Sequence, residues 1–195
     1  MSVETAGKIR LVASPQTLSQ ADRRIVAAAA HCAERVLGLF EAEAAGDSRP
    51  RDAIARTRAF ADGELGVAEE IRRRFVGQAA ARDVRSDAAA AAARASGQAA
   101  AVPHMGAHAL GAAAYAAKAA GLAAPDRPEA IRDEISWQLR YISAAARTAL
   151  RQLPPVGDNS SGPLGPGLLA SDLLGTIFRD LQASLTDRDH PVLPG

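Results

Sequence analysis

The side chains best suited to chemistry lie in one stretch of the sequence, from Pro103 to Lys118. If this stretch is a helix, a rotation of 100° per residue places His104, His108 and Tyr115 in one narrow stripe. A histidine near a helix N-terminus lies at the positive end of the dipole, which lowers its affinity for a proton. The stripe therefore predicts candidate acid–base residues for a cofactor-free isomerase, cyclase or hydrolase.

The same stripe also has two other interpretations. Histidines four residues apart can share a metal ion, but a site needs a third ligand, and no Asp or Glu lies between or beside them. We therefore expect no metal and no cofactor. In the commoner, structural role, both imidazoles and the Tyr115 hydroxyl hydrogen-bond across a helix interface beside small residues.

Two further groups are candidate binding residues. A charge-rich helix start could hold a carboxylate or a protein partner, although local ion pairs on a solvated face are commoner there. Its candidate residues are Arg49, Arg51, Asp52 and Arg58. Trp137 and Tyr141 lie one helical turn apart, a spacing typical of core aromatics and also of a pocket wall or an interface anchor.

Composition narrows the fold and the function. The 195 residues include 47 Ala but only seven Phe, Tyr or Trp, which favours closely packed helices and excludes an all-β fold. With 23 basic and 22 acidic residues the net charge is +1, so no nucleic acid or anionic membrane partner is expected. A single cysteine, Cys32, fits a reducing compartment, and no secretory or spanning segment is recognised, which indicates a cytoplasmic protein.

Helical periodicity predicts a compact antiparallel bundle of about five Ala-rich helices. The expected helices are Ser19 to about residue 45, Arg49 to about Gly63, Glu64 to about Gly97, Pro103 to about Ala120, and Glu129 to Leu153. Because 24 of the 46 residues from Ala79 to Ala124 are Ala, the two helices there are expected to form the tight centre.

A different composition follows this bundle. Ten of the fourteen residues 154–167 are Pro, Gly or Ser, which predicts a linker. An apolar stripe then predicts a C-terminal helix over 168–186, which either folds back on its own bundle or covers a second copy as a homodimer. The predicted organisation is an N-terminal tail (1–17), a helical domain (18–153), the linker, this helix and a tail (187–195).

An ordered set of short motifs is similar to a known family. The motifs are Leu18-Ser19 with Asp22-Arg23-Arg24, His31 to Leu37 with Leu39-Phe40-Glu41, Asp47 with Arg49-Pro50-Arg51 and Ala53-Ile54, Gly63-Glu64, and His104 with Ala107 to Lys118. Together they resemble the bacterial "putative immunity protein" family of polymorphic-toxin systems, helical proteins common in actinobacteria. The resemblance covers about Leu18 to Leu153. Ala55 and Phe60 depart from it, standing where an acidic residue and a Trp are expected.

The resemblance implies a cytoplasmic protein that binds and neutralises a toxin, and we favour this function. In it, a helical surface carries the binding and no catalytic residue is needed. The alternative is the cofactor-free enzyme, in which Trp137 and Tyr141 wall an inter-helical pocket for a small molecule and the two histidines move protons.

Overall fold

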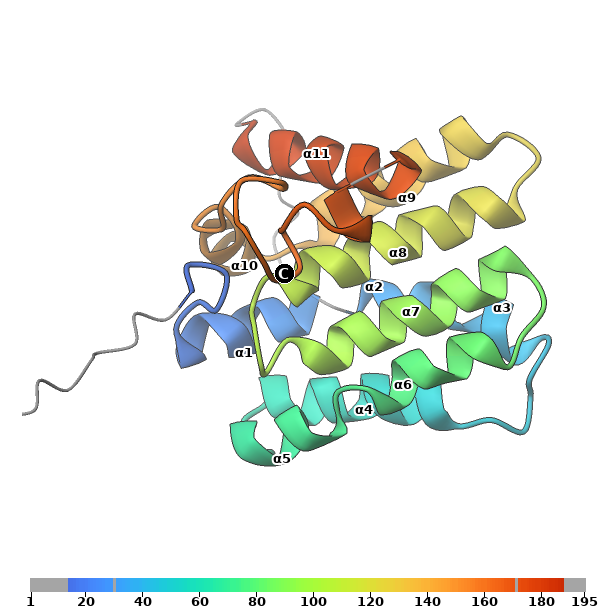
Figure 1. The fold of residues 1–195 in the computed structure, drawn as a ribbon, viewed down its shortest axis with the longest axis horizontal. Helices are drawn as coiled ribbons and strands as arrows, with labels where there is room; N and C mark the ends of the chain where they lie inside the picture. Colours follow the sequence, from blue (N-terminus) through green and yellow to red (C-terminus); the bar gives the residue numbers. More distant parts are fainter. Residues whose placement is uncertain (1–13, 30, 171, 188–195) are drawn as a thin grey trace, which may run out of the picture.

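The computed structural model describes residues 14–29, 31–170 and 172–187, and every regular element in these residues is helical (Figure 1). The all-α helical bundle is therefore confirmed. Its α-helices are α1 (Gln20–Ala29), α2 (Cys32–Arg35), α3 (Leu37–Glu41), α4 (Arg49–Ala61), α5 (Val67–Arg73), α6 (Val76–Ala79), α7 (Asp87–Ala101), α8 (His108–Ala123), α9 (Arg127–Tyr141), α10 (Ala144–Leu150) and α11 (Asp172–Thr186). Two short 3-10 helices are also present: η1 (Ala80–Arg82) lies between α6 and α7, and η2 (Leu168–Ala170) precedes α11.

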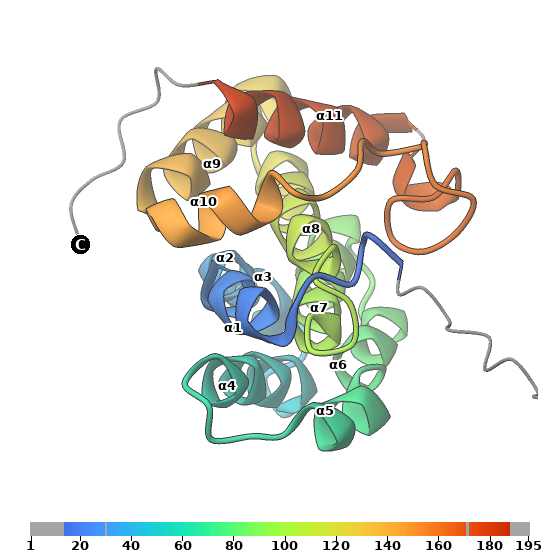
Figure 2. The ribbon, with the colours of Figure 1, turned by 90° about the vertical axis from the view of Figure 1, so that its left-hand side faces the viewer.

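Helix α7 is the centre of the molecule. The Ser86 side chain begins it by accepting a hydrogen bond from the Ala89 backbone N–H at 3.1 Å, and Asp87 lies in its first turn. Twelve of its fifteen residues are buried, and nine of these twelve are Ala. Helices α3, α4, α6 and α8 surround it (Figure 2). Because alanine is small on every side, the helix accepts neighbours on several faces rather than one.

Glycine permits the closest approaches in this core. A Cβ atom added at Gly97 would lie 2.6 Å from the Gln78 Cβ and 2.7 Å from the Gln78 backbone nitrogen. A Cβ at Gly77 would lie 2.9 Å from the Ala53 Cβ, so α4, α6 and α7 meet where neither glycine has a side chain. The predicted tight centre therefore also involves α4 and α6, beyond the alanine-rich pair α7 and α8.

Several predicted helices are shorter than expected. The helix expected over Glu64 to Gly97 is divided into α5, α6, η1 and α7, because the chain turns back to place α6 against α7. The first expected helix is divided into α1, α2 and α3, and the fifth into α9 and α10, where Ser143 caps a new helix after the extended residue Ile142.

The helix expected from Pro103 begins only at His108. The backbone N–H groups of Gly106 and Ala107 donate to the carbonyl oxygens of Thr17 and Gln16, each at 3.0 Å. These bonds tie the turn before α8 to the N-terminal segment, so its backbone is not free to continue a helix. His104 consequently lies in the turn before α8. It is therefore outside the helix on which the sequence predicts it to share a stripe with His108 and Tyr115.

The Pro/Gly/Ser-rich segment 154–167 is packed on the bundle. The Gln16 side chain, 1% exposed, donates to the Ser161 carbonyl at 2.7 Å and accepts from the Leu164 N–H at 2.9 Å. Leu164 is fully buried, and the Gln182 side chain donates to the Pro154 carbonyl at 2.9 Å. These contacts fix the segment against the bundle, whereas its composition predicts a flexible linker. The division of the chain into domains stays a prediction.

Helix α11 packs on α8 and α9 of its own chain (Figure 1). The apolar side chains of its stripe are buried there: Leu174, Ile177, Phe178, Leu181 and Leu185. Of the two expected burial partners, the chain's own bundle is the one observed. The apolar surface that suggested a homodimer is therefore already covered. Within the described residues, no helix is both long and apolar enough to cross a membrane.

We predict that Gly97→Ala lowers the free energy of unfolding by about 1–3 kcal/mol, because its methyl group meets the Gln78 backbone. Gly38→Ala is the matched control. Gly38 is an exposed residue of α3 with no atom within 4 Å of an added Cβ, so the better helix propensity of Ala should raise stability by about 0.5–1 kcal/mol. Urea unfolding followed by circular dichroism measures both, and equal stability of wild type and Gly97→Ala would contradict the glycine contact.

Candidate partner-binding surface

Helix α9 positions a row of large polar and aromatic side chains. The Asp126 side chain begins the helix by accepting from the Glu129 N–H at 3.0 Å, and a proline stands in its first turn. Spacings of three and four residues then place Glu134, Trp137, Gln138 and Tyr141 along neighbouring faces. Helix α2 and the residue before it bring His31 and Arg35 against these side chains.

A buried carboxylate fixes Arg35. The Arg35 Nε lies 3.0 and 3.2 Å from the two Glu134 carboxylate oxygens, and the Gln138 Nε2 donates to one of them at 3.1 Å. The Glu134 side chain is 5% exposed, whereas that of Arg35 is 39% exposed. A buried carboxylate is stable only when its oxygens are partnered, so this pair holds the guanidinium in one place at the surface.

Around that guanidinium, four side chains form what we call the aromatic–arginine cluster: His31, Arg35, Trp137 and Tyr141. The Arg35 guanidinium carbon lies 3.7 Å from the Trp137 ring centroid. The Tyr141 ring stacks on the Trp137 ring at 4.5 Å between centroids. The His31 ring meets the Trp137 ring edge-on, at 5.7 Å between centroids. Tyr141 is 53% exposed despite this contact. The cluster thus presents an ordered aromatic surface to solvent.

A small cavity lies beside Trp137. It has a volume of about 40 Å³ and is lined by His31, Cys32, Gln138 and mostly apolar side chains. This volume suits a water molecule or two, well below the few hundred Å³ of a typical ligand pocket. Burial, together with the Glu134 charge, raises the pKa of Cys32 to about 12, so its thiol stays protonated and is a poor nucleophile.

The predicted acid–base residues lie elsewhere. His104 and His108 are brought together, with ring centroids 6.3 Å apart, and the His108 Nδ1 lies 2.8 Å from the Gln98 Oε1. An amide oxygen can only accept a hydrogen bond, so Nδ1 is the donor. We therefore assign the ring proton of the neutral His108 to Nδ1. Tyr115 lies two turns further along α8 and is partly buried. Neither histidine nor Tyr115 lines the cavity beside Trp137, so the pocket that the enzyme alternative needs does not combine these groups.

The electrostatics of the two histidines have a different cause from the one expected. Burial lowers the pKa of His108 to about 3, and the charges of His104 and Arg74 act in the same direction. Burial also lowers the pKa of His104, helped by Arg74 and Arg23. The low proton affinity expected of His104 is present, but it arises from burial and neighbouring cations instead of a helix N-terminus.

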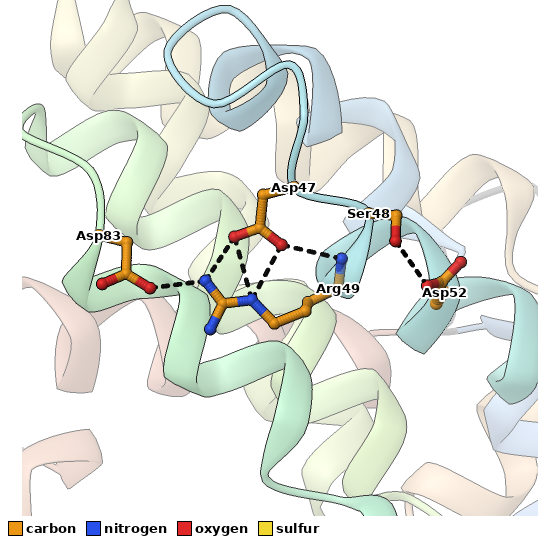
Figure 3. Close-up of polar contacts among 5 residues, drawn as sticks. All are labelled: Asp47, Ser48, Arg49, Asp52 and Asp83. Atoms are coloured by element: carbon orange, nitrogen blue, oxygen red, sulfur yellow. Dashed lines mark hydrogen bonds and ion pairs between the residues drawn. The ribbon is translucent and has the colours of Figure 1, made fainter.

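The charged residues at the start of α4 are paired within the chain. Arg49 donates to both Asp47 carboxylate oxygens and also to Asp83, with its Nη2 2.5 Å from each residue's nearest oxygen (Figure 3). The Ser48 hydroxyl donates to Asp52 at 2.8 Å. Arg51 pairs with Glu41 at 2.5 Å, and Arg58 pairs with Glu34. The Arg49 contacts lower the pKa of Asp47. The three arginines among these predicted binding residues thus form ion pairs within the chain, which was the alternative interpretation, and Asp52 accepts a hydrogen bond from Ser48.

Some residues that matter here were not singled out from the sequence. Arg35 and Glu134 are 99 positions apart, so nothing local indicates that they meet. Gln138 lies four residues after Glu134, and this spacing was the one available sign that it could support the carboxylate. In the described part of the chain, no three His, Cys, Asp or Glu side chains gather closely enough to hold a metal ion.

We predict that Glu134→Gln loosens Arg35 from the Trp137 ring and lowers the free energy of unfolding by about 1–3 kcal/mol, because a charged hydrogen bond is lost. Trp137 is the sole tryptophan, so acrylamide quenching of its fluorescence reports the change directly and should increase. Glu34→Gln, which removes an exposed pair with Arg58, is the matched control and should change stability by less than about 0.5 kcal/mol. Unchanged quenching in Glu134→Gln would contradict the assigned role.

We predict a loss of stability in mild acid that depends on His108. Unfolded chains protonate histidine near pH 6.5, whereas the folded state keeps His108 neutral down to about pH 3. Its contribution is therefore complete above pH 6.5 and falls as the pH drops, by about 1 kcal/mol at pH 5.5. His108→Gln should flatten the change between pH 7.5 and 5.5 in urea unfolding, leaving the smaller contribution of His104. An equally steep change in the variant would contradict the buried neutral imidazole.

Comparisons with known proteins identify the family. Residues 16–145 match the model of a family described as "Imm-5 like putative immunity protein", which covers two thirds of the 195 residues. Neither the curated proteins nor the solved structures gave a match. The matched region begins at the buried Gln16 and includes α2 and α9, so it contains the whole aromatic–arginine cluster. The chain belongs to the Imm-5 like immunity protein family.

Proposed function

We propose that this chain is a cytoplasmic binding protein that neutralises a toxin by covering part of its surface, without a cofactor. Family membership supports the immunity role. We further propose that the aromatic–arginine cluster anchors the toxin. The observation that carries this proposal is the 53% exposure of Tyr141, whose ring packs on Trp137, the ring that the Arg35 guanidinium covers.

The composition of the cluster favours a protein partner. Trp, Tyr and Arg are the residues most enriched at the energetic centres of protein interfaces. Arg35 is held by Glu134 before any partner arrives, so little side-chain freedom remains to be lost on binding. The cavity beside the cluster, about 40 Å³, leaves no room for a typical small-molecule ligand. The small-molecule alternative therefore has no supporting pocket here.

The α4 residues Arg49, Arg51, Asp52 and Arg58 remain the second proposed surface. Each arginine among them already pairs with a carboxylate of its own chain, so a toxin carboxylate would have to compete with an existing partner. Exposed pairs of this kind contribute little to binding energy, and rim charges mainly alter the association rate. We therefore place the anchor at the cluster and assign α4, at most, a role in steering.

The experiment begins with cross-linking and mass spectrometry of the tagged chain purified from its own host, which identifies a protein partner. That partner is then produced from an inducible promoter in a test strain, where we expect it to stop growth and the chain to restore growth. Tyr141→Ala and Arg35→Ala should weaken the complex about 30-fold each, since loss of an anchor residue costs about 2 kcal/mol.

Two controls separate the surfaces. Tyr141→Phe keeps the stacked ring and should bind within about threefold of wild type. Arg51→Glu reverses a charge on α4 and should mainly slow association. Full protection by Tyr141→Ala with lost protection in Arg51→Glu would move the anchor to α4. A cross-linked partner that is harmless to the test strain would overturn the immunity function itself.

A further inference from the structure

A second exposed surface lies where α5 meets α6. Phe75 is 63% exposed and Val76 is 50% exposed. Together with Tyr141 they are the exposed large hydrophobic residues of the described chain. Neither Phe75 nor Val76 contributes to the buried core, and the proposed toxin-binding cluster does not include them. Their exposure is therefore unexplained by folding or by the proposed function.

Arginines without an acidic partner surround this junction. Within the part of the chain that the structure describes, no ion pair involves Arg72, Arg74, Arg82 or Arg94. The carboxylates of the same region are already engaged elsewhere: Glu69 and Glu70 with Arg56, and Asp83 with Arg49. This end of the molecule thus carries a local surplus of positive charge in a chain whose net charge is only +1.

A groove joins the aromatic ring to two of these cations. It has a volume of about 520 Å³ and is lined by Phe75, Gln78, Ala79, Ala81, Arg82 and Arg94, with no carboxylate among them. Arg94 is partly buried, although it lies on the alanine-rich central helix. With no carboxylate in the groove, the Arg94 guanidinium is available to pair with an anion.

The positive field of this region also reaches its neighbours. Burial lowers the pKa values of His104 and His108, and the Arg74 charge acts in the same direction. Burial raises the pKa of Tyr115, and the Arg94 charge opposes that rise. The Arg74 guanidinium carbon lies 4.3 Å from the Phe75 ring centroid, so the exposed ring and a cation already lie together.

We propose that the groove lined by Phe75, Arg82 and Arg94 binds an acidic segment of a protein, whose carboxylates pair with the two arginines while an apolar side chain covers Phe75. A nucleic acid fits less well, because within the described residues four arginines here are unpaired and none of the groove-lining residues is a lysine. The groove and the aromatic–arginine cluster lie on opposite sides of the bundle, since α9 and α6 are separated by α7 and α8 (Figure 2). The site therefore goes beyond the proposed function and does not depend on it.

The test uses the full chain and a defined probe, a fluorescein-labelled peptide of four Glu-Glu-Leu repeats, followed by fluorescence anisotropy at low and moderate salt. We expect wild type to bind it and Arg82→Gln with Arg94→Gln to weaken binding about tenfold or more. Phe75→Ala should weaken it about threefold or more. The matched control Arg132→Gln removes an exposed arginine of α9 that forms no ion pair with any residue the structure describes, and it should bind like wild type.

Three results would overturn the proposal. One is the absence of peptide binding by folded wild type at low salt. Another is equal weakening in Arg132→Gln and in the groove variant, which would show that any positive charge suffices. The third is tighter binding of a fluorescein-labelled single-stranded DNA dodecamer than of the peptide, lost in the same groove variant, which would assign the groove to nucleic acid. Tyr141→Ala should bind the peptide normally, so the outcome is independent of the toxin-binding proposal.

Discussion

The structure depends on how closely its helices approach the alanine-rich helix α7. Nearly all of that helix is buried, and alanine side chains fill little space, so a dense core exists only if neighbouring backbones come very near. Gly97 against Gln78 and Gly77 against Ala53 show the limit of this approach. The breaks between α5, α6 and η1 follow from the same constraint, because short segments can turn to follow the central helix.

Because alanine and glycine form the central core, not every aromatic side chain is needed to fill it. Three of the seven aromatic residues, Phe40, Phe60 and Phe178, are fully buried in the same core as the alanines. Phe75 and Tyr141 are exposed, and Trp137 is held between Tyr141 and Arg35. The exposure of two large aromatic side chains in a chain with so few of them is the physical basis of both proposed surfaces.

The sequence predicts the helical class and the alanine-rich centre, because both follow from propensity and composition. It also predicts the apolar stripe of the last helix, but only the three-dimensional structure shows that α8 and α9 cover it. The turn at His104 was missed because the bonds that cause it come from Gln16 and Thr17, about ninety positions away. The spacing of Trp137 and Tyr141 marks them as candidates, whereas no local pattern marks Arg35 and its buried partner, because the pairing is long-range.

The most direct measurement of the central claim is hydrogen–deuterium exchange of the chain, alone and bound to the toxin that we propose as its partner. Anchoring at the aromatic–arginine cluster predicts slower exchange in residues 31–37 and 132–145, with residues 47–58 of the α4 start unchanged. Slower exchange confined to residues 47–58 would contradict the account and place the toxin on the arginines that the chain already pairs for itself.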